Sequence, residues 1–237
     1  MLYVVAYEQE LYFKQLFKML ELKGSDWAKD CFHVSFGMIN LAEGKMSTRE
    51  GSIVYLEEVL NKSINMAREI IEEKNPSLKN KDAVAKMVGV GAIKYMVLSV
   101  DYKKDIEFSW EKALDIEGNS APYIQYSYAR ANSIIENIGK QSFKYSVHHF
   151  NNEIEHELIK KISTFPLTVE SSAKNYKPHK LASYAHELAM IFNTFYNKIS
   201  VKNAGEKLDS KLSLVKAYMT TAKNSMGLLG INMPDEM

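Results

Sequence analysis

The hydrophobic pattern of the first 40 positions predicts a strand, a helix and a second strand. Met1–Ala6 is a short apolar run of strand type, and apolar residues recur at helical spacing from Glu8 to Gly24. Over Cys31–Ile39 apolar residues alternate with polar ones, as in a half-buried strand. This order is typical of one unit of a parallel α/β sheet. Because a complete sheet needs more strands, we expect the beginning of this domain to be absent.

The rest of the chain predicts helices almost throughout. Val54–Glu73 carries an apolar stripe, and Lys81–Val100 is expected to be helical in pieces around its two glycines. Asp105–Trp110 is expected to be a short extended stretch. The remaining helices are expected at residues 121–138, 149–165, 178–199 and 204–228. The pattern therefore predicts a mainly α protein, in which a remnant of an α/β domain leads into an all-α bundle.

The composition excludes several classes of protein. Of the 237 residues, 46% are hydrophobic and 25% are charged, which excludes disordered, collagen-like and disulfide-scaffold proteins. The longest apolar run, Met87–Val100, is broken by Lys94, so no membrane partner is expected. The N-terminus has no leader pattern, which predicts a cytoplasmic location. A formal net charge of +1 neither requires nor excludes a nucleic-acid partner.

The sequence lacks cysteine and histidine residues at the spacing that a structural metal site needs. Cys31 is the single cysteine of the sequence. His156 and His186 each begin a pattern that resembles a zinc-binding helix, but Lys160 and Met190 stand where the second histidine would be. We therefore expect no structural metal.

Residues 44–51, Gly-Lys-Met-Ser-Thr-Arg-Glu-Gly, combine features of a mobile nucleotide-binding loop. Two glycines allow movement, a hydroxyl can meet a phosphate oxygen, and Lys45 and Arg49 place two cations on one short segment. Positive charge near pyrophosphate stabilises the transition state of its release. By composition alone, a solvated charged turn is as good an interpretation of this segment as a nucleotide-binding loop.

This segment resembles the signature loop of class I aminoacyl-tRNA synthetases, in the form that arginyl-tRNA synthetases use. Further segments resemble parts of that family in the same order, so the resemblance covers essentially the whole chain. They are residues 3–9, 33–39, 90–95, 105–110, 119–130, 192–196 and 228–237. The resemblance implies the C-terminal part of a Rossmann-type catalytic domain at residues 1–110 and an α-helical anticodon-binding domain at residues 111–237.

The resemblance assigns catalytic roles within the loop. Lys45 and Ser47 fall on catalytic positions, and both would bind ATP together with Met46. Thr48 stands where the general class I signature has its second lysine, and Arg49 is a candidate to supply that cation to ATP.

The resemblance also assigns residues outside the loop. Gln9 would contact the arginine substrate, and the adenosine site would be lined by His33, Gly37 and Met38. Aromatic and polar residues of the second domain would face the tRNA, because unstacked anticodon bases can stack on aromatic rings. The alternative for each of these tyrosines is a place in a helix core. The implied tRNA-binding residues are Tyr123, Tyr126, Arg130, Asn193, Tyr196 and Met237.

The implied activity is the attachment of arginine to its tRNA, with ATP and Mg²⁺ in the complete enzyme, which is expected to be a monomer. The family's first half of the nucleotide fold, with its His-Ile-Gly-His motif, is absent from these residues, so we expect them alone to be inactive. One alternative is a free-standing, non-catalytic tRNA- or RNA-binding helical module, and another is a helical scaffold. An open reading frame that continues upstream of Met1 into such a motif would favour the enzyme.

Overall fold

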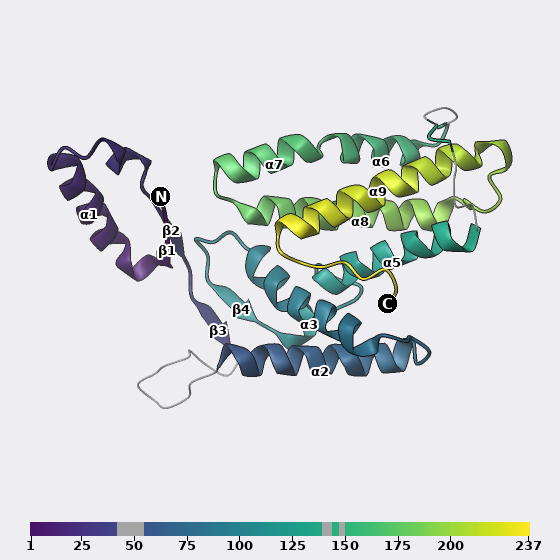
Figure 1. Cartoon of the computed structure of the whole chain (residues 1–237), viewed down its shortest axis with the longest axis horizontal. Helices are drawn as coiled ribbons and strands as arrows, with labels where there is room; N and C mark the ends of the chain where they lie inside the picture. The colour runs from purple at the N-terminus through teal and green to yellow at the C-terminus, as the bar shows by residue number, and fades with distance from the viewer. Residues whose placement is uncertain (42–54, 139–143, 147–149) are drawn as a thin grey trace. The chain divides into compact units, whose positions relative to one another are not determined.

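The computed structural model describes residues 1–41, 55–138, 144–146 and 150–237 (Figure 1). Within these ranges helices dominate and strands are few, as the sequence predicts. The chain divides into two compact units. The first unit contains Met1–Ile53 and Val100–Ser109, and the second contains Val54–Ser99 and Trp110–Met237. The helices at residues 56–98 thus cluster with the helices after residue 110, and a domain boundary at residue 110 stays a prediction.

The first unit begins with the predicted strand–helix–strand arrangement. Strand β1 (Leu2–Ala6) pairs in parallel with β2 (Phe32–Phe36), and their first residues lie opposite each other, as do their last. Helix α1 (Glu10–Leu22) provides the long connection that parallel strands require. The prediction of one parallel α/β unit is therefore confirmed.

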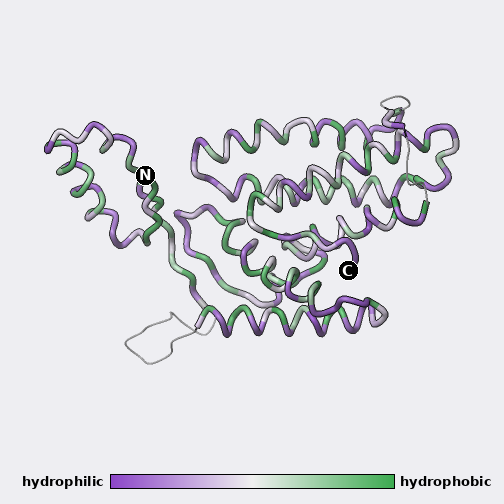
Figure 2. Tube along the Cα trace, viewed as in Figure 1, coloured by the Kyte–Doolittle hydropathy of each residue, from purple (hydrophilic) through white to green (hydrophobic). Residues whose placement is uncertain are grey.

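The two faces of this strand pair differ in their covering. On one face Tyr3 packs against α1, with ring centroids 5.2 Å from Phe13 and 5.4 Å from Phe17. The alternate residues of β1 point to the other face, where Leu2 is 49% exposed and Val4 is 64% exposed. Figure 2 shows the hydropathy of the residues along the whole trace, with hydrophobic stretches in green. The strand pair therefore carries one covered face and one bare apolar face.

A second pair of parallel strands continues the first unit. Strand β3 (Ile39–Leu41) pairs with β4 (Ile106–Phe108), which confirms the extended stretch predicted near residue 105. Just before β3, the Gly37 amide donates a hydrogen bond to the Tyr102 carbonyl oxygen at 2.7 Å. A Cβ at position 37 would lie 2.3 Å from the Lys104 carbonyl oxygen. Only glycine allows the two backbone segments to approach this closely.

The second unit begins with two closely packed helices, α2 (Leu56–Lys74) and α3 (Lys81–Leu98). The prediction that the second of these would be broken at its glycines is wrong, because α3 is continuous. Gly89 faces α2, where an added Cβ would lie 2.7 Å from the Ile64 Cα. The Ser63 hydroxyl donates to the Gly89 carbonyl oxygen at 2.9 Å in the same contact. The glycine therefore allows close helix packing and does not end the helix.

The remaining helices form a bundle after the short helix α4 (Trp110–Ala113). Their core contains the rings of Phe192 and Tyr218, which stack with centroids 3.8 Å apart and 4° between their planes. The bundle helices are α5 (Ala121–Ile138), α6 (Glu153–Ser163), α7 (Phe165–Lys174), α8 (Pro178–Lys198) and α9 (Leu208–Leu228).

The sequence prediction of one helix over residues 149–165 is wrong at both ends. Asn152 caps α6, because its side chain accepts the Ile154 amide at 3.2 Å. Glu155 completes the capping box, so the helix begins at residue 153. The separate helix α7 was missed, although Pro166 stands in its first turn, where proline is favourable.

The C-terminal segment, residues 229–237, is held by side chains from several elements of the second unit. The Gln125 Nε2 donates to the Asn232 carbonyl oxygen at 2.7 Å, and the Lys94 ammonium donates to the Gly230 carbonyl oxygen at 2.6 Å. Asn132 and Asn75 donate to the carbonyl oxygens of residues 235 and 237. The segment is therefore held by hydrogen bonds to its backbone and by the side chains of Leu229, Ile231 and Met233, which are buried in the hydrophobic core.

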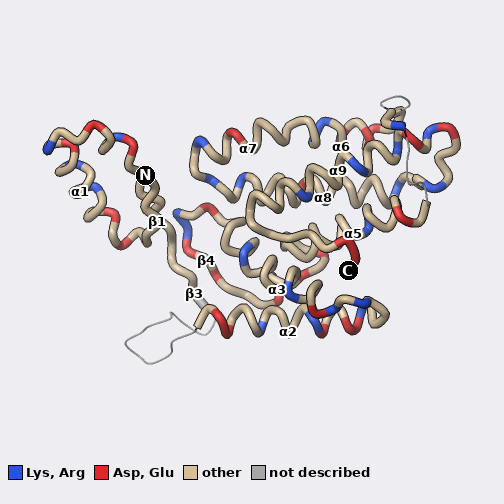
Figure 3. Tube along the Cα trace, in the orientation of Figure 1, with Lys and Arg blue, Asp and Glu red and all other residues tan. Residues whose placement is uncertain are grey.

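Basic and acidic residues are interspersed along the helices, as Figure 3 shows. This distribution agrees with the near-zero net charge of the sequence. None of the helices in the part of the chain that the structure describes is long and apolar enough to cross a membrane.

Candidate functional site

The carboxyl ends of β1 and β2 carry three predicted substrate residues. Gln9 ends the 3-10 turn that follows β1, while Gly37 and Met38 come directly after β2. The in-register pairing places both strand ends at one edge of the sheet. Open α/β sheets bind their ligands at this edge. The structure therefore brings Gln9, Gly37 and Met38 to the same edge, and their substrate contacts stay predictions.

The backbone around Met38 is fixed by its neighbours in the first unit. Its amide donates to the Asp105 carboxylate at 2.7 Å, and its side chain is 38% exposed. The segment between β2 and β3 is thus held firmly while the side chain stays accessible to a ligand.

His33 lies within β2 and not at its end. Its Nε2 is 2.9 Å from the Val5 carbonyl oxygen, and its ring stacks on Phe13 with centroids 4.4 Å apart. Since a carbonyl can only accept, Nε2 carries the proton in this contact. These contacts hold His33 half-buried on the α1 side of the strand pair. Its predicted position beside adenosine stays a prediction.

The signature segment lies outside the described residues. This applies to Lys45, Met46, Ser47 and Arg49. Their assignment to ATP and to catalysis therefore rests on the sequence.

Three predicted tRNA residues come together where α5 packs against α8. The Arg130 guanidinium carbon lies 4.4 Å from the centroid of the Tyr126 ring and 5.4 Å from that of Tyr196. The Arg130 Nη2 also donates to the Tyr126 hydroxyl at 3.3 Å. We call Tyr126, Arg130 and Tyr196 the Arg130 cluster.

The Arg130 cluster has the chemistry to hold a nucleotide. Its cation attracts phosphate, and flat rings and guanidinium planes stack on unpaired bases. The Tyr196 side chain is 40% exposed, and the other two members are half-buried, so the cluster is reachable from solvent. The contacts between the two tyrosines and the arginine fix the groups before any ligand arrives.

Two further predicted residues lie one helical turn before members of the cluster. Tyr123 precedes Tyr126 on α5, and its ring centroid lies 5.3 Å from that of His186 on α8. Asn193 precedes Tyr196, and its buried Oδ1 has no hydrogen-bond partner among the described residues. That oxygen is a free acceptor next to the cluster.

Burial sets the protonation of the groups on this side of α8. Burial lowers the pKa of His186, while the Glu187 carboxylate and a backbone hydrogen bond with Gly118 oppose that shift. Burial also raises the pKa of Tyr95 above its ordinary range. The Tyr95 hydroxyl therefore stays protonated and lies 2.6 Å from the Asn119 Oδ1.

Met237 makes its described contacts elsewhere in the second unit. Its side chain packs against the apolar cluster of α2 and α3, which includes Ile71 and Val84. The Asn75 Nδ2 donates to its carbonyl oxygen at 3.4 Å. A role for Met237 in tRNA binding stays a prediction.

The described residues offer no ready set of metal ligands. No group of three or more His, Cys, Asp or Glu side chains within residues 1–41, 55–138, 144–146 and 150–237 could hold a metal ion. We therefore assign no ligands to the Mg²⁺ that would accompany ATP.

Two known domains match the chain one after the other. Residues 1–110 match the catalytic domain of class I (R) tRNA synthetases, and residues 124–237 match the DALR anticodon binding domain. The chain is 40% identical over 238 residues to the arginine–tRNA ligase of Clostridium acetobutylicum. It is 44% identical over 240 residues to that of Clostridium beijerinckii. These alignments cover 100% and 99% of this chain and 42% of each relative.

A solved structure agrees with these matches. The arginyl-tRNA synthetase of Thermus thermophilus is similar with a TM-score of 0.90 and 32% identity. That similarity covers 100% of this chain and 41% of the Thermus chain. The chain belongs to the arginyl-tRNA synthetase family. It spans about 42% of the length of the curated relatives that it matches.

Sequence reasoning missed the residues that hold the C-terminal segment. Gln125 is fully buried and donates to backbone carbonyls of Met87 and Asn232. A glutamine among the apolar residues of a helix was the available signal. Asn75 precedes a proline and was interpreted only as the end of a helix.

Proposed function

We propose that this chain is part of an arginine–tRNA ligase, where it contributes one side of the adenylation site and the anticodon-binding helices. The observation that carries the proposal is the similarity to arginine–tRNA ligases along the entire chain. The match of a catalytic domain followed by an anticodon-binding domain supports it.

The proposed reaction has two steps. Arginine and ATP form arginyl adenylate and pyrophosphate, and the arginyl group then passes to the tRNA. The Lys45 ammonium and the Ser47 hydroxyl would stabilise the charge that develops on the phosphates, together with Met46 and Arg49 of the same segment. ATP would be accompanied by Mg²⁺, which supplies further positive charge at the phosphates.

The first unit would provide the part of the site that faces adenosine and arginine. Gln9 would contact the arginine substrate, and Gly37 and Met38 would line the adenosine site with His33. The bare face of β1, with Leu2 and Val4, supports the view that more of a catalytic fold is needed to complete this site. We therefore propose that these 237 residues alone do not form arginyl adenylate.

The second unit would bind the tRNA. The exposed ring of Tyr196 beside Arg130 and Tyr126 supports stacking of an unpaired base at the Arg130 cluster. Tyr123, Asn193 and Met237 would extend this surface. We propose that binding occurs as a monomer in the cytoplasm.

Two measurements on the 237-residue chain test the proposal. ATP–pyrophosphate exchange with arginine and tRNA should stay at background, and turnover above background would contradict the proposed incompleteness of the site. Binding of arginine tRNA should be saturable and should weaken as salt rises. Absence of tRNA binding at low salt would contradict the proposed role of the second unit.

A non-catalytic RNA-binding module would give the same two results. The two hypotheses differ when the rest of a related catalytic domain is supplied in trans. The ligase predicts that exchange activity then appears and is lost in Lys45→Ala. The module predicts no exchange under any condition.

A further inference from the structure

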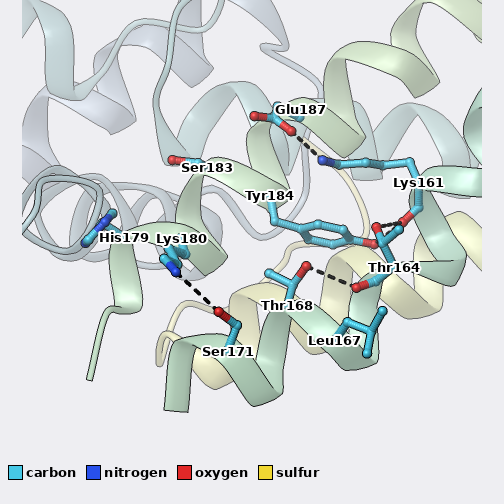
Figure 4. Close-up of a pocket in the computed structure, with 10 residues that line it drawn as sticks. All are labelled: Lys161, Thr164, Leu167, Thr168, Ser171, His179, Lys180, Ser183, Tyr184 and Glu187. Atoms are coloured by element: carbon cyan, nitrogen blue, oxygen red, sulfur yellow. Dashed lines mark hydrogen bonds and ion pairs between the residues drawn. The ribbon is translucent and has the colours of Figure 1, made fainter. Parts of the chain in front are cut away.

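A pocket of about 430 Å³ lies between α6, α7 and α8, on a part of α8 that precedes the Arg130 cluster (Figure 4). Its volume falls within the range that small-molecule sites occupy. The residues that line it include Lys161, Thr164, Thr168, Ser171, Lys180 and Glu187.

One end of the pocket is cationic. The Lys180 Nζ lies 3.2 Å from the Ser171 Oγ, and this hydroxyl is the partner that the structure gives it among the described residues. A neutral hydroxyl does not compensate the ammonium charge. Because the Ser171 oxygen accepts this hydrogen bond, its own O–H can still donate. Two donors therefore meet at this end, which suits an oxyanion.

The charge of Lys180 is also poorly placed for the stability of its own helix. Lys180 and His179 lie in the first turn of α8, which contains no acidic residue. The N-terminus of a helix carries partial positive charge, so cations there are unfavourable. A bound anion would relieve this repulsion. Local conflicts of this kind are expected where a residue serves a function.

At the opposite end of the pocket, the positive and negative side-chain charges neutralise each other. The Lys161 ammonium forms an ion pair with the Glu187 carboxylate and lies 4.8 Å from the centroid of the Tyr184 ring. Glu187 is seven residues from Lys180 on α8, about 10 Å along the helix axis. The carboxylate that could repel an anion is therefore distant from Lys180 and already paired.

The wall formed by α7 and the residue before it presents hydrogen-bond acceptors. The Thr164 Oγ1 donates to the Lys161 carbonyl oxygen at 2.8 Å, and the Thr168 Oγ1 donates to the Thr164 carbonyl oxygen at 3.0 Å. Both hydroxyl protons are thus used within the helices, and both oxygens keep lone pairs that can accept. A ligand that fits this wall must donate, as a sugar hydroxyl does.

We propose that this pocket binds a ribose phosphate, with the phosphate at Lys180 and Ser171 and the sugar hydroxyls against Thr164 and Thr168. The ligand could be one nucleotide of an RNA strand or a free ribonucleotide, since both present this group. The site is separate from the Arg130 cluster and does not depend on the proposed aminoacylation function.

Titration of the 237-residue chain with ribose 5-phosphate at constant ionic strength tests the proposal. Binding should be saturable and should shift the amide resonances of Ser171 and Lys180. Lys180→Gln should weaken it roughly tenfold or more, because a charge-assisted hydrogen bond is lost. Lys86→Gln, at an exposed position of α3, is the matched control and should bind as the wild type does.

A second variant separates the sugar from the phosphate. Thr168→Val keeps the shape of the side chain and should weaken ribose 5-phosphate roughly threefold while leaving inorganic phosphate unchanged. Equal binding of ribose 5-phosphate by wild type and Lys180→Gln, or no saturable shift at these amides, would overturn the proposal. An unchanged affinity in Thr168→Val would overturn its sugar contacts.

Competition identifies the source of the ligand. Displacement of ribose 5-phosphate by a short single-stranded RNA would identify an RNA nucleotide, and displacement by AMP alone would identify a free ribonucleotide. If neither displaces it, the nucleotide assignment is wrong. Failure of arginine tRNA to bind the chain would contradict the proposed function, yet it would leave the ribose 5-phosphate titration and its Lys180→Gln control unaffected.

Discussion

The Gly89 backbone on α3 lies against the Ile64 backbone on α2, and a Cβ at position 89 would be 2.7 Å from the Ile64 Cα. This approach is closer than real Cβ atoms show, so a side chain there requires the two helices to separate. The close packing of α2 against α3 therefore depends on the absence of a Cβ at position 89. This helix pair follows the signature segment in the chain.

Replacement of this glycine should destabilise the second unit. Gly89→Ala should lower the free energy of unfolding by about 1–3 kcal/mol, because overpacking outweighs the gain in helix propensity. Gly227→Ala is the matched control, since a Cβ there meets nothing within 4 Å. The control should raise the free energy of unfolding by about 0.5–1 kcal/mol. Urea denaturation measures both, and equal effects would contradict the close packing.

The Arg130 cluster should contribute to tRNA binding through its aromatic faces. Tyr126→Ala should weaken the binding of arginine tRNA by about 1–3 kcal/mol at fixed salt, because a stacking surface is removed. Tyr126→Phe keeps the ring and loses only the hydroxyl that Arg130 contacts. It should therefore bind much more tightly than Tyr126→Ala. A dissociation constant unchanged in Tyr126→Ala would end the assignment of this residue to the tRNA.

The sequence predicted the elements whose signal is local. The alternation over Cys31–Ile39 predicted β2, and apolar spacing predicted α8 and α9 to within a few residues. The continuity of α3 was not predictable in this way. Helix propensity treats Gly89 as a break, and only its contact with another helix explains why it is tolerated.

In the candidate site, too, the features with a local sequence signal were predictable, and those set by tertiary packing were not. Tyr126 and Arg130 are four residues apart, so a shared helix face follows from the sequence. The position of Tyr196 beside them depends on how α8 packs on α5, and no local sequence pattern predicts that packing. The pocket at Lys180 was missed for the same reason, because its walls come from three helices.

A buried ion pair should be essential to the start of α6. Glu155 and Lys211 pair with side chains only 1% and 8% exposed, and Glu155 also accepts the Asn152 amide at 3.2 Å. Lys211→Met should cost about 3–5 kcal/mol in the free energy of unfolding, because it leaves a buried carboxylate without its partner. The double variant Lys211→Met/Glu155→Gln should recover part of this loss.

The exposed pair Lys174–Glu170 provides the control for that measurement. Its side chains are 72% and 54% exposed, so Lys174→Met should change the free energy of unfolding by at most about 0.5 kcal/mol. Similar losses for Lys211→Met and Lys174→Met would show that burial of the first pair has no energetic consequence.

The low pKa of His186 predicts how stability depends on pH. Burial holds the folded pKa below the ordinary value of 6.5, so the unfolded state takes up a proton first as the pH falls. The stability associated with neutral His186 is therefore complete above about pH 6.5 and is lost progressively below it. His186→Gln cannot take up this proton, and its free energy of unfolding should fall less than that of the wild type between about pH 7 and pH 5. Denaturant titrations at several pH values measure the difference.

A second variant tests the sign of this effect. The Glu187 carboxylate raises the pKa of His186 and so opposes the shift caused by burial. Glu187→Gln should depress the folded pKa further, and the loss of stability towards acidic pH should become larger than in the wild type. In the double variant with His186→Gln this additional loss should disappear. A pH dependence identical in wild type and His186→Gln would contradict the assignment of this effect to His186.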